Sequence, residues 1–318
     1  MFYECSNLES INISSFNTQN VTDISYMFYK CQNLICLDLS SFDTQKVSNM
    51  ENMFAFCEKL NILNLSSFIT KNVNNMFGMF RSCKSINNLD LSSFNTENAN
   101  NMSSMFEDCE ILNNLNLSSF NTKIVENMKC MFCGCKNLKY LDLTKFDTKK
   151  VKYFSGMFER CENLKNLDLS KFETSNVIDM SYMFNQCKTL NSLDLLPFDT
   201  QNVKNMEYMF ANCENLTNLN ISSFITKNVT NMKAMFGGCA NISNLNLSKF
   251  ETDKVGDMSY MFYNCYKLKD LDISSFDTQK IEKIRGIFHG ININITINKN
   301  KFKEFKNDIL FSEFIENS

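Results

Sequence analysis

The sequence is poor in the residues that usually turn a backbone. Its 318 residues include only eight glycines and one proline. A chain with many tight hairpins normally needs more of both, so another regular device must turn this backbone. The sequence also has a single histidine, His289, close to its end.

Several functional classes leave no mark in the sequence. No apolar stretch approaches the roughly 18 residues of a membrane-spanning helix, and no basic segment followed by an apolar core opens the chain as in a signal peptide. The net charge of −3 comes without the basic stripe that binds nucleic acid. There is no glycine-rich phosphate loop, and one histidine cannot supply repeated general bases. We therefore predict that the protein is not an enzyme and uses no cofactor.

What the sequence has is a repeat of 26 residues without insertion or deletion. A phenylalanine column runs from Phe16 to Phe276 and a threonine column from Thr18 to Thr278. This period is typical of a solenoid, in which each repeat packs on its neighbours. Eleven cysteines form a third column: Cys5, Cys31, Cys57, Cys83, Cys109, Cys135, Cys161, Cys187, Cys213, Cys239 and Cys265.

Within one repeat the apolar spacing changes from two residues to three or four. Leu37 and Leu39 flank Asp38, the alternation of a strand with one buried face. The serines and threonines that follow are expected to close a turn by side-chain-to-backbone hydrogen bonds. Residues 47–57 then carry the apolar stripe of a short amphipathic helix. The sequence therefore predicts an α/β solenoid of about eleven 26-residue repeats, with a parallel sheet on one side and short helices on the other.

The recurring pattern L-x-x-L-[DN]-L-S-S-F-[DN]-T, followed by V-x-N-M-x-x-M-F-x-x-C, resembles the BspA-like leucine-rich-repeat surface proteins of bacteria and some protists. The resemblance covers residues 1 to about 290. It implies a leucine-rich-repeat solenoid displayed at the cell surface, adhesion to host matrix, mucin or other cells, and no catalytic residues. Many relatives carry an export signal or an anchor, and none is visible in this sequence.

The two ends of the chain depart from the repeat. The chain begins inside a unit at Met1, and an uncovered first strand is unfavourable, so we expect either a fragment of a longer protein or an unusually small cap. At the other end, residues 291–297 alternate as a last strand, and residues 301–316 have the apolar pattern of a closing helix. We expect repeats over residues 1–290 and a C-terminal cap over residues 291–318.

The cysteine column predicts buried thiols, because it lies on the expected helix stripe beside Met and Phe. Disulfides between neighbouring copies remain an alternative, since such copies could lie within reach of one another. Cys130, Cys133 and Cys135 resemble part of a zinc site, but no second ligand cluster follows. We therefore predict no metal.

The candidate binding residues lie on the open face of the predicted sheet. The polar column between the inward leucines holds Asn or Asp in every repeat, with three carboxylates in succession in its middle part. Calcium would relieve their repulsion, although a solvated ladder flanked by two lysines is the simpler hypothesis. One tyrosine adds an exposed aromatic, a residue type that often anchors interfaces. The candidates are Lys139, Tyr140, Asp142, Lys165, Asp168 and Asp194.

The sequence favours a non-catalytic binding module at the cell surface or outside the cell. Its predicted partner is a protein or glycan held on the sheet face, as in an adhesin, with no role for nucleic acid. The alternative is a cytoplasmic scaffold for protein–protein interactions. Fourteen cysteines and the lack of a visible signal peptide favour that alternative, because reducing compartments keep thiols free.

Overall fold

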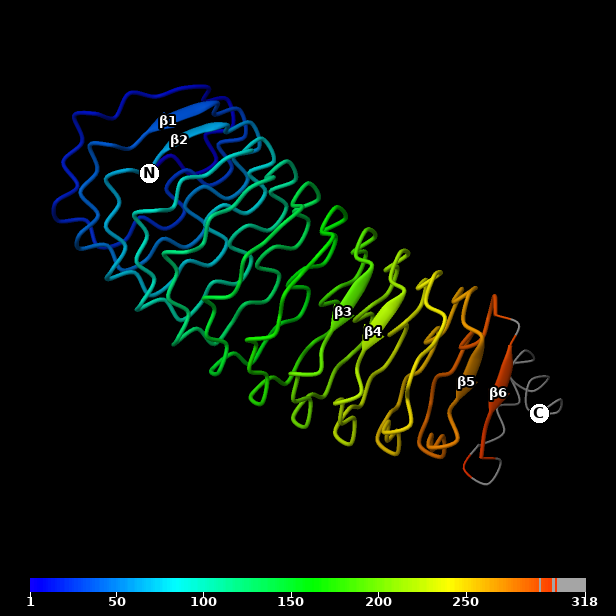
Figure 1. The fold of residues 1–318 in the computed structure, drawn as a ribbon. Coiled ribbons are helices and arrows are strands. Elements are labelled where there is room, and N and C mark those ends of the chain that lie inside the picture. The colour runs from blue at the N-terminus through cyan, green and yellow to red at the C-terminus, as the bar shows by residue number, and fades with distance from the viewer. Residues whose placement is uncertain (292, 299–300, 302–318) are drawn as a thin grey trace. The chain divides into compact units, whose positions relative to one another are not determined.

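The computed structural model describes residues 1–291, 293–298 and 301. They form two compact units, residues 1–151 with 157–168, and residues 152–156 with the described residues from 169 onward. In each unit the chain runs as successive coils that stack on one another (Figure 1). The repeat solenoid predicted from the sequence is therefore confirmed within each unit.

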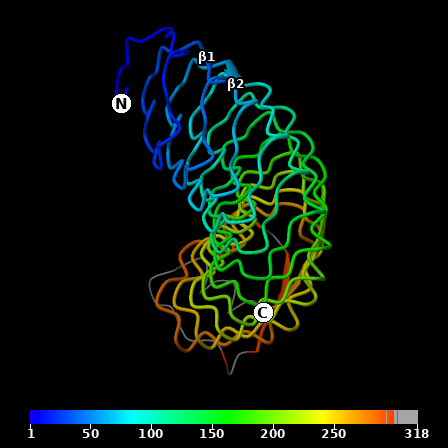
Figure 2. The same cartoon turned by 90° about the vertical axis from the view of Figure 1, so that its left-hand side faces the viewer.

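Short parallel strands mark one side of the coils. Figure 2 shows β1 and β2 on neighbouring coils of the first unit. Leu37 of β1 aligns with Leu63 of β2, a shift of 26 residues, whereas Leu271 of β5 aligns with Ile295 of β6, a shift of 24. The last described coil is thus two residues shorter. The paired strands are β1 (Cys36–Asp38) with β2 (Ile62–Asn64), β3 (Ser192–Asp194) with β4 (Asn218–Asn220), and β5 (Asp270–Asp272) with β6 (Asn294–Thr296).

The prediction of short helices is wrong for the described residues, where tight turns take their place. Alternate N–H groups of this segment donate to the next coil, as from Tyr26 to the Glu51 carbonyl (2.8 Å) and from Phe28 to the Met53 carbonyl (2.9 Å). Tyr26 and Lys30 have left-handed backbones, with φ of 55° and 57°. An α-helix needs negative φ throughout and bonds within its own turn. The ladder between coils therefore excludes a helix.

The core consists of apolar columns that stack from coil to coil. The phenylalanine of each Met-Phe pair lies over its counterpart, with ring centroids 5.9 Å apart for Phe28 and Phe54 and 5.7 Å apart for Phe210 and Phe236. Phe146, in the other phenylalanine column, is only 3% exposed. Stacked rings of this kind add about 0.5–1.5 kcal/mol per pair beyond the burial of their surface.

Asparagine and aspartate make the turns that glycine and proline make elsewhere. In three columns of the repeat the side-chain Oδ1 accepts a hydrogen bond from the backbone N–H two residues later, which is an Asx turn. This local bond shapes a turn without a glycine, and it accounts for the scarcity of glycine and proline. One coil has all three: Asp38 with Ser40 (2.9 Å), Asp43 with Gln45 (2.9 Å) and Asn49 with Glu51 (3.1 Å).

The threonine column connects neighbouring coils and does not close its own turn, contrary to expectation. Thr96 is fully buried, and its hydroxyl donates to the Asn121 carbonyl (2.9 Å) while accepting from the Asn121 N–H (2.8 Å). Thr44 makes the same two bonds to Ile69 (3.1 and 2.7 Å). One hydroxyl therefore satisfies both polar groups of a residue on the next coil.

The strand β6 falls inside residues 291–297, where the last strand of the cap is expected. The closing helix expected over residues 301–316 lies outside the described residues, apart from Lys301.

Candidate binding surface

The residues proposed for binding are all exposed on the strand side of the coils. The alternation that places them there is visible beside Tyr140, which is 66% exposed while the next residue, Leu141, is 7% exposed. Five of the six belong to two neighbouring repeats of the first unit, and Asp194 belongs to β3 of the second unit. The exposed residues are Lys139, Tyr140, Asp142, Lys165, Asp168 and Asp194.

The carboxylates of this face also shape the fold. Asp142 Oδ1 accepts from the Thr144 hydroxyl (2.7 Å) and from the Thr144 N–H (2.9 Å). These two bonds, the hydroxyl first, lower the pKa of Asp142 from its ordinary value. Asp194 Oδ1 accepts from the Leu196 N–H (3.1 Å) and from Asn220 Nδ2 (2.8 Å). Asp142 and Asp194 are therefore turn-forming residues as well as exposed carboxylates.

The strand face of the first unit also exposes apolar side chains that the sequence analysis did not single out. Ile62 of β2 is 64% exposed, and Ile35, next to β1, is 43% exposed. Cys36 of β1 aligns with Ile62 in the parallel pair and is exposed as well. For Ile62 the available signal was the column that also contains Tyr140, in which a large side chain replaces the usual Asn or Ser.

A second aromatic group lies on the turn side of the second unit. The rings of Tyr182 and Tyr208 stack with centroids 4.9 Å apart, and Lys233 Nζ lies 5.5 Å from the centroid of Tyr208. Both tyrosines are partly exposed and have left-handed backbones. This pair was not predicted from the sequence, because the segment that contains it was expected to be a helix.

The cysteine column consists of buried thiols apart from the exposed Cys5, and none of the fourteen cysteines forms a disulfide in the structure. Cys57 donates its S–H to the Phe28 carbonyl at 3.1 Å, a bond that recurs along the column. Burial raises the pKa of the Cys31 thiol to about 11 and that of Cys161 to about 12, so these thiols stay protonated at neutral pH. Within the described residues, no group of three or more His, Cys, Asp or Glu side chains is placed to hold a metal ion.

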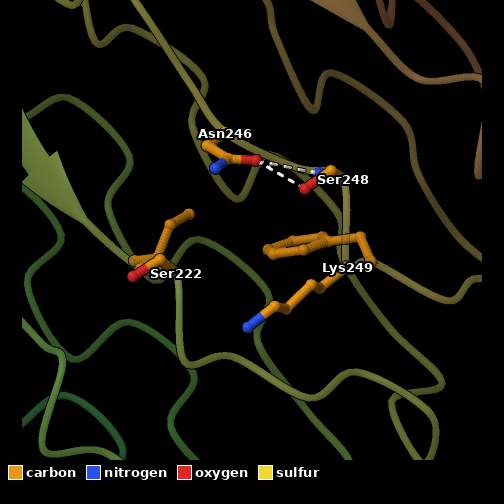
Figure 3. A pocket seen from close by; sticks show the side chains of 6 residues that line it. Ser222, Asn246, Ser248 and Lys249 are labelled. Atoms are coloured by element: carbon orange, nitrogen blue, oxygen red, sulfur yellow. Dashed lines mark hydrogen bonds between the residues drawn. The ribbon is translucent and has the colours of Figure 1, made fainter.

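The surface offers little room for a small molecule at the pocket drawn in Figure 3. This cavity of about 30 Å³ lies in the second unit beside an Asx turn, where Asn246 Oδ1 accepts from the Ser248 N–H (3.2 Å) and hydroxyl (2.8 Å). Pockets for organic ligands measure roughly 300–1,000 Å³, so this one can take water only. In the described part of the chain, no helix is both long and apolar enough to cross a membrane.

Comparison with protein families gives a match along most of the chain. The family described as "Mycoplasma protein of unknown function, DUF285" matches in overlapping segments, over residues 1–115, 61–142, 101–215, 131–245 and 183–302. The chain belongs to this family. The resemblance to BspA-like leucine-rich-repeat proteins is thereby confirmed at the level of a repeat family. A search of curated proteins finds no match.

Three solved leucine-rich-repeat proteins are similar to this DUF285 member at low identity. A leucine rich cell surface protein from Faecalibacterium prausnitzii is 15% identical with a TM-score of 0.46, over 89% of this chain and 79% of that protein. A protein from Bacteroides ovatus is 17% identical with a TM-score of 0.36, over 86% and 87%. One from Eubacterium ventriosum is 15% identical with a TM-score of 0.39, over 90% and 82%.

Proposed function

We propose that this DUF285 protein is a non-catalytic, adhesin-like binding module that contacts a protein or glycan through the strand face. The observation that carries the proposal is the 66% exposure of Tyr140 between the exposed charges of Lys139 and Asp142. Tyrosine joins an apolar ring to a hydrogen-bonding hydroxyl, which suits it to anchor an interface. Repeat solenoids bind partners through extended surfaces of this kind.

The charges around Tyr140 favour a polar partner. Lys139 and Lys165 stand in one column of neighbouring repeats, and Asp142 and Asp168 stand in another, so both signs alternate around the ring. A mixed patch of this kind offers donors and acceptors to a glycan or to a polar protein surface. We propose display at the cell surface, which is what the resemblance to BspA-like proteins implies.

Binding to immobilised mucin, measured by biolayer interferometry, tests the proposed face. Tyr140→Asn introduces the residue that Asn114 and Asn166 place in the same column, and Tyr266→Asn removes a tyrosine that is 62% exposed outside the strands. Loss of an interface anchor costs about 2 kcal/mol or more, so Tyr140→Asn should weaken binding about 30-fold and Tyr266→Asn less than about twofold.

Periodate treatment of the mucin distinguishes the two partner classes, because it destroys glycans and leaves the protein. Binding that disappears after periodate assigns a glycan partner, and binding that persists assigns a protein partner. Equal binding by both variants would contradict the strand-face assignment. Failure of the parent chain to bind either form would contradict an adhesin for mucin.

A scaffold in a reducing compartment is the second candidate function. It is favoured by fourteen cysteines that form no disulfide in the structure, since disulfides are rare where glutathione and thioredoxin keep cysteine reduced. Protease added to intact cells that express the protein separates the two candidates. A displayed chain is degraded, whereas an intracellular chain survives until the cells are lysed.

A further inference from the structure

Two cysteines of the first unit differ from the buried column. Cys130 and Cys133 lie in the turn segment, where the Cys133 N–H donates to the Cys130 carbonyl at 3.1 Å. The ends of such a turn lie within about 7 Å of each other, and a disulfide spans Cα distances of about 4.4–6.8 Å. The backbone therefore already holds them in the arrangement of a pair that can be joined.

The two thiols differ in their access to solvent. Cys130 is partly exposed, whereas Cys133 is 4% exposed. The pKa of Cys130 is lowered by a hydrogen bond with Cys133. The pKa of Cys133 is raised by the same interaction and by burial. Because the thiolate is the attacking species, Cys130 is the thiol that a reagent in solution meets first.

Charged groups surround Cys133. Arg160 Nη2 lies 3.6 Å from Cys133 Sγ and 2.9 Å from Asp108 Oδ1, while Glu159 Oε2 lies 3.9 Å from the same sulfur. The guanidinium reaches Asp108 across Gly134, at which a Cβ would lie 2.2 Å from Asp108 Oδ1. A cation beside a sulfur stabilises its thiolate. The arginine can thus support the second sulfur when it loses its proton.

Cys135, the column cysteine next to this pair in the sequence, is not accessible to solvent. Cys135 is fully buried and donates its S–H to the Phe106 carbonyl at 3.2 Å. Burial raises the pKa of Cys135 well above its ordinary value. A thiol of this kind reacts only after the coil opens. The proximity of two sulfurs, the exposure of one and the arginine beside the other occur together at 130 and 133.

We propose that Cys130 and Cys133 form a redox-active dithiol, which a low-molecular-weight disulfide oxidises to an intrachain disulfide. Cys130 loses its proton and attacks one sulfur of R–S–S–R, whose S–S bond breaks; the released thiolate takes up that proton. Cys133 then loses its proton and attacks Cys130 Sγ, which breaks the mixed disulfide and releases the second R–SH. Two protein thiols are oxidised, and R–S–S–R is reduced to two R–SH. The proposal is independent of the binding function of the strand face.

Peptide mapping of the folded chain after exposure to glutathione disulfide tests this proposal. The exposed single thiols are first removed with Cys5→Ser and Cys36→Ser, which serve as the common background for all variants. Free thiols are blocked with iodoacetamide before digestion without reductant. We expect a Cys130–Cys133 disulfide while Cys109 and Cys135 are recovered as free thiols. Iodoacetamide alone should label Cys130 at least about tenfold faster than Cys135.

Two single variants establish the order of the steps. Cys133→Ala copies Ala55 and Ala211 of the same column, and Cys130→Ser copies Ser104, so both are compatible with the coil. In Cys133→Ala, Cys130 should remain as the glutathione mixed disulfide. In Cys130→Ser, Cys133 should stay unmodified. Circular dichroism confirms that each variant is folded.

Three results would overturn the proposal. The first is a parent chain in which Cys130 and Cys133 react only after unfolding in urea. The second is a folded chain in which Cys130 forms a mixed disulfide with glutathione that Cys133 never displaces. The third is modification of Cys133 in the Cys130→Ser variant at the rate of Cys130 in the Cys133→Ala variant, which would remove the distinction between attacking and resolving thiols.

Discussion

The substitution Thr96→Val removes the connection between two coils without changing the shape of the side chain. Valine keeps the volume of threonine but offers no acceptor to the Asn121 N–H and no donor to the Asn121 carbonyl, which bond the Thr96 hydroxyl at 2.8 and 2.9 Å. Thr96 is fully buried, so water does not easily replace the hydroxyl. Leaving such groups unpaired costs about 1–3 kcal/mol, and we expect Thr96→Val to lower the free energy of unfolding by that amount.

Thr96→Ser is the matched control, because it keeps the hydroxyl and loses only a methyl group. Its cost should be about 0.8 kcal/mol, the value of one buried methylene-sized group. Since the sequence has no tryptophan, unfolding in urea is best followed by far-UV circular dichroism. Hydrogen exchange should show faster exchange of the Asn121 amide in Thr96→Val and not in Thr96→Ser. If hydrophobicity alone decided stability, Thr96→Val would be more stable than Thr96→Ser. A valine variant as stable as the parent, with a slowly exchanging Asn121 amide, would therefore refute the reasoning.

Three further changes probe the core, the turns and the polar columns. Phe146→Ala should lower the free energy of unfolding by about 3–5 kcal/mol in urea melts, because the ring is 3% exposed; an unchanged midpoint would mean that the column is not core. Gly134→Ala should cost about 1–3 kcal/mol, because φ is 73° and the new Cβ would displace Asp108, whereas Gly256→Ala, with its nearest neighbour at 3.8 Å, should be close to neutral. Turn hydrogen bonds lower the pKa of four column aspartates, so their contribution to stability is present above the unfolded pKa and is lost as pH falls through the lower folded pKa. Urea melts should show a smaller loss from pH 7 to pH 3 when all four are changed to Asn; an equal loss would place the acid sensitivity elsewhere. The four are Asp38, Asp90, Asp142 and Asp272.

The repeat, the strand alternation and the core columns could be predicted because spacing alone encodes them. An inward-facing leucine of one coil recurs 26 positions later, as Leu37 does at Leu63, and the register of the strands follows directly. The helix prediction failed because apolar steps of three and four residues also arise in successive tight turns. The discriminating signal was glycine in the columns of Tyr26 and Lys30, as at Gly78 and Gly134, both of which have positive φ.

Exposed residues could be predicted from the sequence only on the strand side, where exposed and buried residues alternate. Tyr140 was assignable to the open face because it precedes the inward Leu141 by one residue. The environment of Cys133 could not be predicted, because it depends on the direction in which the successive turns orient each side chain of this segment. Arg160 reaches Asp108 two repeats away, and no pattern within one repeat reports a contact of that range.

The columns also restrict where a specific function can be placed in this protein. The threonine and cysteine positions make hydrogen bonds that hold one coil on the next, and the Asx positions make the hydrogen bonds that shape the turns. A change at any of them therefore disturbs the stacking of the repeats. A partner cannot select those positions without a cost in stability. Specific recognition or chemistry must therefore reside in residues that depart from their column, and Tyr140 on the strand face and the pair Cys130 and Cys133 on the turn side are departures of this kind.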